Sequence, residues 1–418
     1  MNLLKLSWKY LTHRPLTTGL NVFLLSLGLA IITVLLLVQD QFEKKMTQDA
    51  EGIDLVVGAK GSPLQLILSS VYHVDFPTGN IPMEEAIRLS RSRLVKQTIP
   101  LALGDNFQGY RIVGTNHDYL TLYQAVFSEG EAWNEPFEVV LGAVVAEKSG
   151  FKVGDSFSGS HGISEGSHDH DEHAFRVVGI LEPKGNVLDR LVLTSIESVW
   201  FTHDESETKD ESSENESDHH EKFHQEVAKT GFPESDQERE VTSLLVQYRS
   251  PMAAVQLPRM INSNTSMQAA SPSFEISRLF ELLGVGVKIL EGLAYVLIII
   301  SGLGIFIALY NSLKERRYDL AVLRAIGASR FQLLLLILME GLALTFLGSI
   351  LGILLGHVFL AALASQNETG VGAGLEAWIF LPAELWIVIY ALGVGLVGSL
   401  LPAWSAYRTS IADQLMKK

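Results

Sequence analysis

Two histidine-rich stretches hold the side chains of this 418-residue chain that are best suited to chemistry. Eight of its 12 histidines fall between His161 and His224, interleaved with carboxylates. Neutral imidazoles and carboxylates are competent ligands for zinc or copper. The alternative is a solvated acidic loop whose histidines bind nothing. The candidate metal ligands are His168, His170, His173, His219, His220 and His224.

Two short patterns in these stretches match catalytic motifs, but neither has the context that its chemistry needs. Residues 220–224 fit H-E-x-x-H, which in zinc proteases places two imidazoles and a general-base Glu on one helix. The surrounding residues 201–240 carry 14 acids and four bases without apolar periodicity, which predicts disorder over most of this stretch. Residues 162–166 fit G-x-S-x-G, but no strand leads into them and no helix follows. We therefore expect a non-catalytic chain.

The composition divides the chain into apolar parts and one acidic block. Mean hydropathy is +0.23, although the net charge is −15. Residues 39–291 hold 40 of the 47 acids and 21 of the 32 bases, so this block carries −19 and the remainder +4. The negative charge excludes nucleic-acid binding by a basic surface. The chain has no cysteine, which excludes disulfides and thiolate metal sites.

Four apolar runs are long enough to cross a bilayer, whose hydrocarbon core of about 30 Å requires about 20 helical residues. They predict membrane-spanning helices at residues 15–39, 292–313, 331–364 and 385–407. The fold class that follows is a membrane protein with four transmembrane α-helices and an α+β extracytoplasmic domain, residues 40–291, inserted between the first two. The domain is expected to carry His/acid-rich insertions at 158–173 and 201–240.

The third apolar run contains the residues most open to a functional role. Glu340 and His357 are ionisable, and such groups inside a membrane helix are functional candidates. Glu340 closely follows the base Arg330, so we expect it to be hydrated near the membrane surface. Small residues four apart predict tight packing of this helix against a neighbour. The packing candidates are Gly348, Gly352 and Gly356.

Lysine and arginine in the short flanking segments predict the orientation. Bases occur in the tail 1–14, in the connection 314–330 and in the tail 408–418, whereas the connection 365–384 has none. Both termini and the 314–330 connection are therefore expected in the cytoplasm, and the acidic block outside.

The acidic block contains several patterns typical of an α+β domain. Alternating and β-branched residues predict strands at 137–141, 174–181 and 243–248, a short helix at 143–149 and a turn at 152–155. The first histidine-rich insertion would then be the loop of a hairpin.

The connection between the second and third runs reads KERRYDLAVLRAIGASRFQ. Its first half predicts a short amphipathic helix that Gly327 can end, and Ser329 can cap the next helix. The run from Glu315 to Ser329, followed by a long apolar helix with an early Glu340, resembles the signature of the FtsX/MacB/LolC/LolE family of ABC-transporter permeases. Residues 137–181 resemble the MacB-like periplasmic core domain.

The resemblance implies a permease subunit in a bacterial inner membrane, working with a second permease copy as a homodimer or heterodimer. The 314–330 connection would be the coupling helix that docks on a separate, dimeric ABC ATPase, although its arginines could instead bind lipid phosphates. Because no Gly is followed by Lys, these residues contain no G-x-x-x-x-G-K-[ST] loop, and ATP would be hydrolysed by the partner. The coupling residues are Glu315, Arg316, Arg317, Leu320, Leu323, Arg324 and Gly327.

The expected function is mechanotransmission: ATP-driven motion of the partner reaches the outer domain and exports or extracts a substrate. No cofactor is expected on the chain itself, apart from a divalent metal if the histidines bind one. The other candidate partners are a periplasmic adaptor or substrate-binding protein and membrane lipid. Two alternatives stay open: a metal-linked ABC system that uses the histidine-rich loops, and an FtsX-like regulator of an envelope enzyme.

Overall fold

The computed structural model describes residues 15–158, 174–208, 227–234, 238–366 and 375–408. The chain divides into two compact units. The helical unit is drawn from residues 1–42, 282–368 and 372–418, and the sheet unit from residues 43–281 with 369–371.

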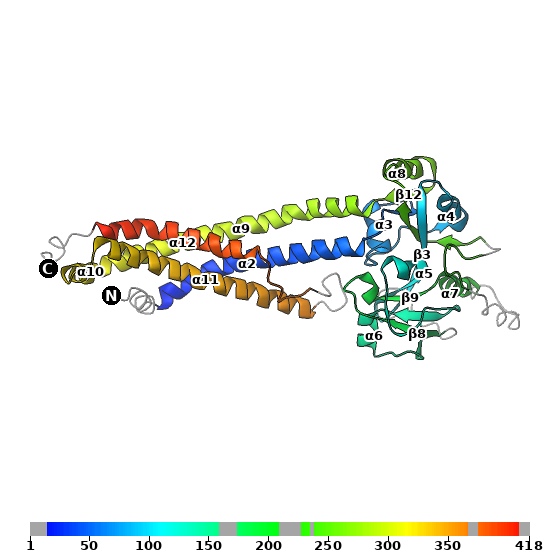
Figure 1. Ribbon diagram of the computed structural model, residues 1–418, viewed down its shortest axis with the longest axis horizontal. Coiled ribbons are helices and arrows are strands. Elements are labelled where there is room, and N and C mark those ends of the chain that lie inside the picture. The colour runs from blue at the N-terminus through cyan, green and yellow to red at the C-terminus, as the bar shows by residue number, and fades with distance from the viewer. Residues whose placement is uncertain (1–14, 159–173, 209–226, 235–237, 367–374, 409–418) are drawn as a thin grey trace. The chain divides into compact units, whose positions relative to one another are not determined.

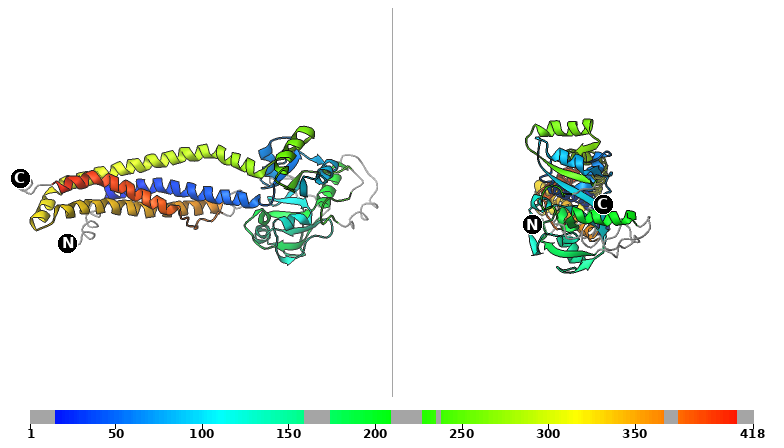
Figure 2. Two further views of the ribbon diagram at one scale, coloured as in Figure 1. Left: turned by 45° about the horizontal axis from the view of Figure 1, so that its top comes forward. Right: turned by 90° about the vertical axis from the view of Figure 1, so that its right-hand side faces the viewer.

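Long apolar helices form the helical unit, and in Figures 1 and 2 they lie side by side. They are α2 (Pro15–Asp49), α9 (Pro272–Glu315), α11 (Arg330–Gln366) and α12 (Glu384–Tyr407). Among the described residues, these four are long and apolar enough to cross a membrane. Helices α2 and α9 extend beyond the predicted spans 15–39 and 292–313 into the sheet unit. An apolar run marks the part suited to lipid, whereas a helix continues wherever its polar residues are good helix formers.

Small residues bring α2 and α11 close together. A Cβ atom added at Gly352 would lie 2.7 Å from Leu29 Cβ and 2.9 Å from the Ser26 carbonyl oxygen of α2. One turn away on either side, Gly348 faces Leu25 of α2 and Gly356 faces Thr33 and Ala30. The spacing of four residues therefore places all three glycines on the α2-facing side of α11.

The sheet unit is built on a ten-stranded sheet of order β12-β1-β11-β3-β4-β9-β6-β8-β5, with β7 paired to β8. Its strands are β1 (Leu55–Ala59), β3 (Val95–Phe107), β4 (Tyr110–Thr115), β5 (Phe127–Gly130), β6 (Glu138–Leu141), β7 (Ser156–Phe157), β8 (Phe175–Leu181), β9 (Leu191–Ser195), β11 (Ser243–Tyr248) and β12 (Met267–Ala270). Strands β2 (Ile81–Pro82) and β10 (Glu240–Val241) pair separately.

Short helices connect these strands (Figure 1). They are α3 (Pro63–Ser70), α4 (Met83–Ser90), α5 (His117–Leu122), α6 (Ala143–Ser149), the 3₁₀ helix η1 (Val187–Arg190), α7 (Ile196–Thr208) and α8 (Ala253–Asn264). The long strand β3 pairs with β11 along its first half and with β4 along its second half, and the register shifts between Leu103 and Asn106.

The two halves of the sheet have separate apolar cores. One core gathers side chains from β1, β11, α7 and α8, including Val57, Leu244 and Leu257. The other gathers side chains from β6, β8 and α6, including Val139 and Val145. The sheet unit is thus two packed lobes that share β3.

The elements predicted in the outer domain are confirmed to within a residue. Helix α6 has the predicted bounds 143–149, and β6, β8 and β11 match the three predicted strands. Strand β7 pairs antiparallel with β8, so the first histidine-rich insertion does connect the strands of a hairpin. The α+β class and its place between the first two apolar helices are likewise confirmed.

Candidate functional site at the connection between α9 and α11

A short helix, α10 (Arg317–Ala325), occupies the connection between α9 and α11. Its inner face carries the buried residues Leu320 and Ala321, and Leu323 packs beside them. Leu320 and Leu323 join one apolar cluster with residues of three long helices: Leu309 and Leu313 of α9, Leu333, Leu336 and Ile337 of α11, and Ala403 and Ala406 of α12. A displacement of α10 would therefore act on all three helices together.

The two ends of the turn after α10 are defined by specific residues. Gly327 has φ +114°, a conformation that a residue with a Cβ rarely adopts. The Ser329 hydroxyl accepts from the Gln332 backbone N–H at 3.2 Å, and the Ser329 backbone N–H donates to Gln332 Oε1 at 2.8 Å. This reciprocal pair is a capping box at the start of α11, so the predicted ending and cap are confirmed.

A buried ion pair links the end of α9 to α11. Arg316 Nη1 lies 3.1 Å from Glu340 Oε1, and their side chains are 14% and 3% exposed. The expectation that Glu340 is hydrated at the membrane surface was therefore wrong. The prediction relied on the short sequence separation between Arg330 and Glu340 on one helix. It did not consider that Arg316, at the end of the neighbouring helix, could pair with Glu340.

The outer face of the connection exposes large apolar side chains. Tyr318 is 63% exposed, Ile326 is 80% exposed and Phe331, in the first turn of α11, is 64% exposed. Asp319 is also exposed. An apolar surface with interspersed charge, next to charged termini of helices, is typical of a protein interface.

The structure separates the predicted coupling residues into two groups. Leu320, Leu323 and Arg316 face the helix bundle, and Arg324 is half-buried. Glu315 and Gly327 are exposed. Arg317 begins α10, and its side chain lies outside what the structure describes. Tyr318 and Ile326 provide the exposed apolar surface.

A second ionisable pair connects α11 and α12. His357 Nδ1 lies 2.5 Å from the Ala377 carbonyl oxygen, which can only accept, so Nδ1 carries a proton and donates. His357 Nε2 lies 3.1 Å from Glu384 Oε2, while Glu384 Oε1 accepts from the Leu381 N–H at 2.9 Å. The contact between His357 Nε2 and Glu384 Oε2 therefore joins α11 to the first turn of α12. The sequence singled out His357 but not its partner, which lies 27 positions along the chain.

The end of α2 is held in the sheet unit by polar side chains. The Tyr72 hydroxyl donates to the Met46 carbonyl at 2.9 Å, and the Tyr123 hydroxyl donates to the Asp49 carbonyl at 2.7 Å. The Asp49 carboxylate pairs with Arg190 at 3.5 Å. The Tyr123 hydroxyl therefore satisfies a carbonyl that the helix end otherwise leaves unpaired, and the Tyr72 hydroxyl adds a second donor to the Met46 carbonyl, which also accepts from the Ala50 N–H at 3.3 Å.

A buried histidine lies beside these tyrosines. His73 Nε2 is 3.1 Å from the Tyr119 hydroxyl, and the Tyr119 and Tyr123 rings pack edge to face. Burial lowers the pKa of His73 to about 3, and Arg111 and Arg190 contribute in the same direction. Burial also raises the pKa of Tyr119 and Tyr123.

The metal hypothesis concerns residues outside the described part of the chain. His168, His170, His173, His219, His220 and His224 all fall there, as do both catalytic-like patterns. Within the described ranges, no three His, Asp or Glu side chains are grouped so that they could hold a metal ion.

Family models match two parts of the chain. Residues 18–261, more than half of the chain, match the MacB-like periplasmic core domain. Residues 292–411 match the FtsX-like permease C-terminal domain.

Known proteins resemble the chain over shorter stretches. An uncharacterized ABC transporter permease of Methanocaldococcus jannaschii is 25% identical over 32% of this chain and 34% of its own length. The ABC transporter permease YtrF of Bacillus subtilis is 28% identical over 29% of this chain and 30% of its own length. The macrolide export ATP-binding/permease protein MacB of Rhodopirellula baltica is 25% identical over 43% of this chain and 27% of its own length. The chain thus spans about a third of the length of the curated relatives it matches, or less.

Among solved structures, the periplasmic region of MacB from Actinobacillus actinomycetemcomitans aligns with 57% of this chain and 98% of its own length. The TM-score is 0.33 and the identity 11%. The extracellular domain of the transporter YknZ from Gram-positive bacteria aligns with 52% of this chain and 99% of its own length, with a TM-score of 0.31 and 12% identity.

Proposed function

The chain belongs to the family of ABC transporter permeases with a MacB-like periplasmic core domain, and from this premise we propose that it transmits ATP-driven motion of a separate ATPase to its sheet unit. Both termini and α10 would lie in the cytoplasm of a bacterial cell, and the sheet unit outside its inner membrane. The ATPase would be a dimer, served by this chain and a second permease copy. The moving sheet unit would export or extract a substrate.

The observation that carries this proposal is the two-sided structure of α10. Tyr318 and Ile326 are exposed, while Leu320 and Leu323 pack against the long helices. A partner that binds the exposed side would therefore push on the packed side.

The Arg316–Glu340 pair gives the connection a defined geometry. It joins the end of α9 to α11 within a buried environment, where removing one partner is costly. Gly327 and the Ser329 cap set the turn on the other side of α10. The connection would thus move as a unit instead of bending under load.

Helices α2 and α9 would carry the motion onward, because both contribute residues to the helical unit and to the sheet unit. At the end of α2, Tyr72, Tyr123 and Arg190 bind the last turn. A shift of that turn would displace the elements that hold these three side chains.

The coupling role can be tested by ATP hydrolysis in the assembled complex. The full chain is purified in lipid nanodiscs with the ATPase that co-purifies with it. We expect Ile326→Asp to reduce stimulation of ATP hydrolysis about tenfold, because a charge would replace an exposed apolar contact. Its thermal unfolding should be unchanged, since Ile326 is 80% exposed.

The matched control is Val255→Asp on α8, which is 65% exposed in the sheet unit and should retain full stimulation. Normal stimulation by the Ile326→Asp protein would contradict the coupling role.

A further inference from the structure

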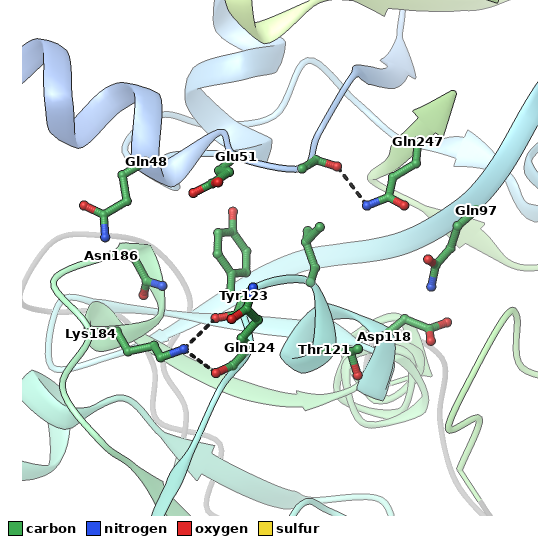
Figure 3. Close-up of a pocket in the computed structure, with 12 residues that line it drawn as sticks. Gln48, Glu51, Gln97, Asp118, Thr121, Tyr123, Gln124, Lys184, Asn186 and Gln247 are labelled. Carbon is green, nitrogen blue, oxygen red and sulfur yellow. Dashed lines mark hydrogen bonds between the residues drawn. The ribbon is translucent and has the colours of Figure 1, made fainter. Parts of the chain in front are cut away.

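A groove of about 490 Å³ opens in the sheet unit where α2 ends. In Figure 3 the end of α2, with Gln48 and Glu51, forms one wall, together with Gln97 of β3 and Gln247 of β11. The opposite wall is α5 with the turn after it and the segment before η1. The family resemblance assigns no role to this groove.

Primary amides dominate the lining. Gln247 Nε2 donates to the Gly52 carbonyl at 3.0 Å, which fixes that side chain. The side chains of Gln48, Gln97 and Gln124, in contrast, have no hydrogen-bond partner within the described part of the chain. Each of these three offers one acceptor oxygen and two N–H donors to whatever occupies the groove.

The charges of the lining favour a cation. Glu51 and Asp118 contribute carboxylates from opposite walls. Lys184 is engaged, because its ammonium donates to the Tyr123 carbonyl at 3.2 Å and to the Gln124 carbonyl. The block 39–291, with 40 acids and 21 bases, adds a negative field that attracts cations toward the groove.

We propose that this groove binds an extended cationic peptide segment. Every residue of an extended peptide presents one N–H and one C=O, which primary amides can pair in both directions. Glu51 and Asp118 would bind the ammonium or guanidinium groups of such a segment. An anionic ligand would face two carboxylates against one ammonium, that of Lys184, which already donates to two carbonyl oxygens.

The same lining disfavours a saccharide, whose apolar face usually rests on an exposed aromatic ring. Tyr123 is only 7% exposed, and its hydroxyl is already bonded to the Asp49 carbonyl. Leu122 provides a small apolar contact, and Gly52 lies directly against it: a Cβ at Gly52 would be 2.8 Å from Leu122 Cδ1.

Binding can be measured independently of the coupling to an ATPase. The full chain in nanodiscs is titrated with a fluorescein-labelled peptide Ala-Lys-Ala-Lys-Ala, followed by fluorescence anisotropy. We expect saturable binding that the double variant Glu51→Gln, Asp118→Asn weakens about tenfold. The peptide Ala-Gln-Ala-Gln-Ala, which lacks the positive charges, should bind the unmodified chain about tenfold more weakly than the lysine peptide does.

Two further variants separate the groove from general surface charge. Gln124→Ala removes an unpaired amide and should weaken binding several-fold, whereas Glu129→Gln, an exposed carboxylate on β5 outside the lining, should leave it unchanged. The proposal is overturned if the lysine peptide does not saturate, if the double variant binds it as well as the unmodified chain, or if a trisaccharide of N-acetylglucosamine competes more strongly than the peptide.

Discussion

The connection around α10 and the end of α2 are each held by a buried ion pair. At the connection, Arg316 pairs with Glu340 at 3.1 Å; at the end of α2, Arg190 pairs with Asp49 at 3.5 Å. Each pair is buried, and each ties a long helix to the elements around it. Such pairs add little net stability but define geometry, because neither partner tolerates loss of the other.

The surfaces beside these two pairs differ in chemistry. The connection exposes apolar side chains, represented by Ile326, whereas the end of α2 exposes amides and carboxylates, represented by Gln48 and Glu51. An exposed apolar surface is suited to a large protein interface, and a polar groove to a small hydrophilic ligand. The first region is therefore suited to contact a protein, and the second to contact small molecules in solution.

Among the predicted changes, removing an arginine from a buried ion pair should have the largest effect on stability. Arg316→Ala leaves the Glu340 carboxylate buried and unpaired, and should destabilise the full chain by about 3–5 kcal/mol. Arg190→Ala should cost less, because its pair is longer. Arg88→Ala serves as the control: its pair with Glu84 spans 3.0 Å, but the two side chains are 75% and 87% exposed, so a change of about 1 kcal/mol or less is expected. Thermal unfolding in nanodiscs measures the stability of all three variants. Equal decreases in their melting temperatures would contradict the distinction between buried and exposed ion pairs.

Measuring stability as a function of pH tests the contribution of His73, which lies beside the tyrosines at the end of α2. The pKa of His73 is about 3 in the folded chain against 6.5 ordinarily, so between these values the unfolded chain binds a proton that the folded chain does not. Stability should therefore fall by about 1.6 kcal/mol from pH 6.5 to pH 5 through this residue.

The variant His73→Asn should lose that part of the pH dependence. Asparagine tolerates the left-handed backbone at this position, where φ is +55°. The measurement is denaturant unfolding of the full chain at both pH values, and an unchanged pH dependence in the His73→Asn protein would rule out His73 as the source.

Glycine substitutions test the packing of α11 on α2 and should have the smallest effect. A methyl group at Gly352 would meet Leu29 and the Ser26 backbone, so Gly352→Ala should destabilise the chain by about 1 kcal/mol. Gly393→Ala on α12 is the matched control, because nothing lies within 4 Å of a Cβ there. It should be neutral or slightly stabilising, since Ala is the better helix former. Thermal unfolding checks both.

Sequence alone was sufficient for features that depend on local patterns. Apolar runs revealed the four long helices, alternation revealed β6, β8 and β11, and Gly327 with Ser329 marked the turn between α10 and α11. Each signal lies within a few residues of the feature it predicts, so no knowledge of the tertiary structure was required.

Features that join distant residues could not be predicted in this way. Arg316 and Glu340 were both noted, but their pairing depends on how α9 and α11 pack, and His357 was noted without Glu384. The groove at the end of α2 combines residues from 48 to 247, none of which forms a motif. A signal was present for Glu340, since a carboxylate inside an apolar helix needs a partner, and the nearest helix ends offered bases.

The central claim is that α10 faces the cytoplasm while the sheet unit lies outside, and cysteine labelling tests it most directly. The chain has no cysteine, so Ile326→Cys and Val255→Cys each introduce one exposed thiol. Intact spheroplasts are treated with a membrane-impermeant maleimide. We expect the thiol at position 255 to react at once, and the thiol at position 326 to react only after the membrane is permeabilised. Labelling of position 326 in intact spheroplasts, with position 255 protected, would contradict the account.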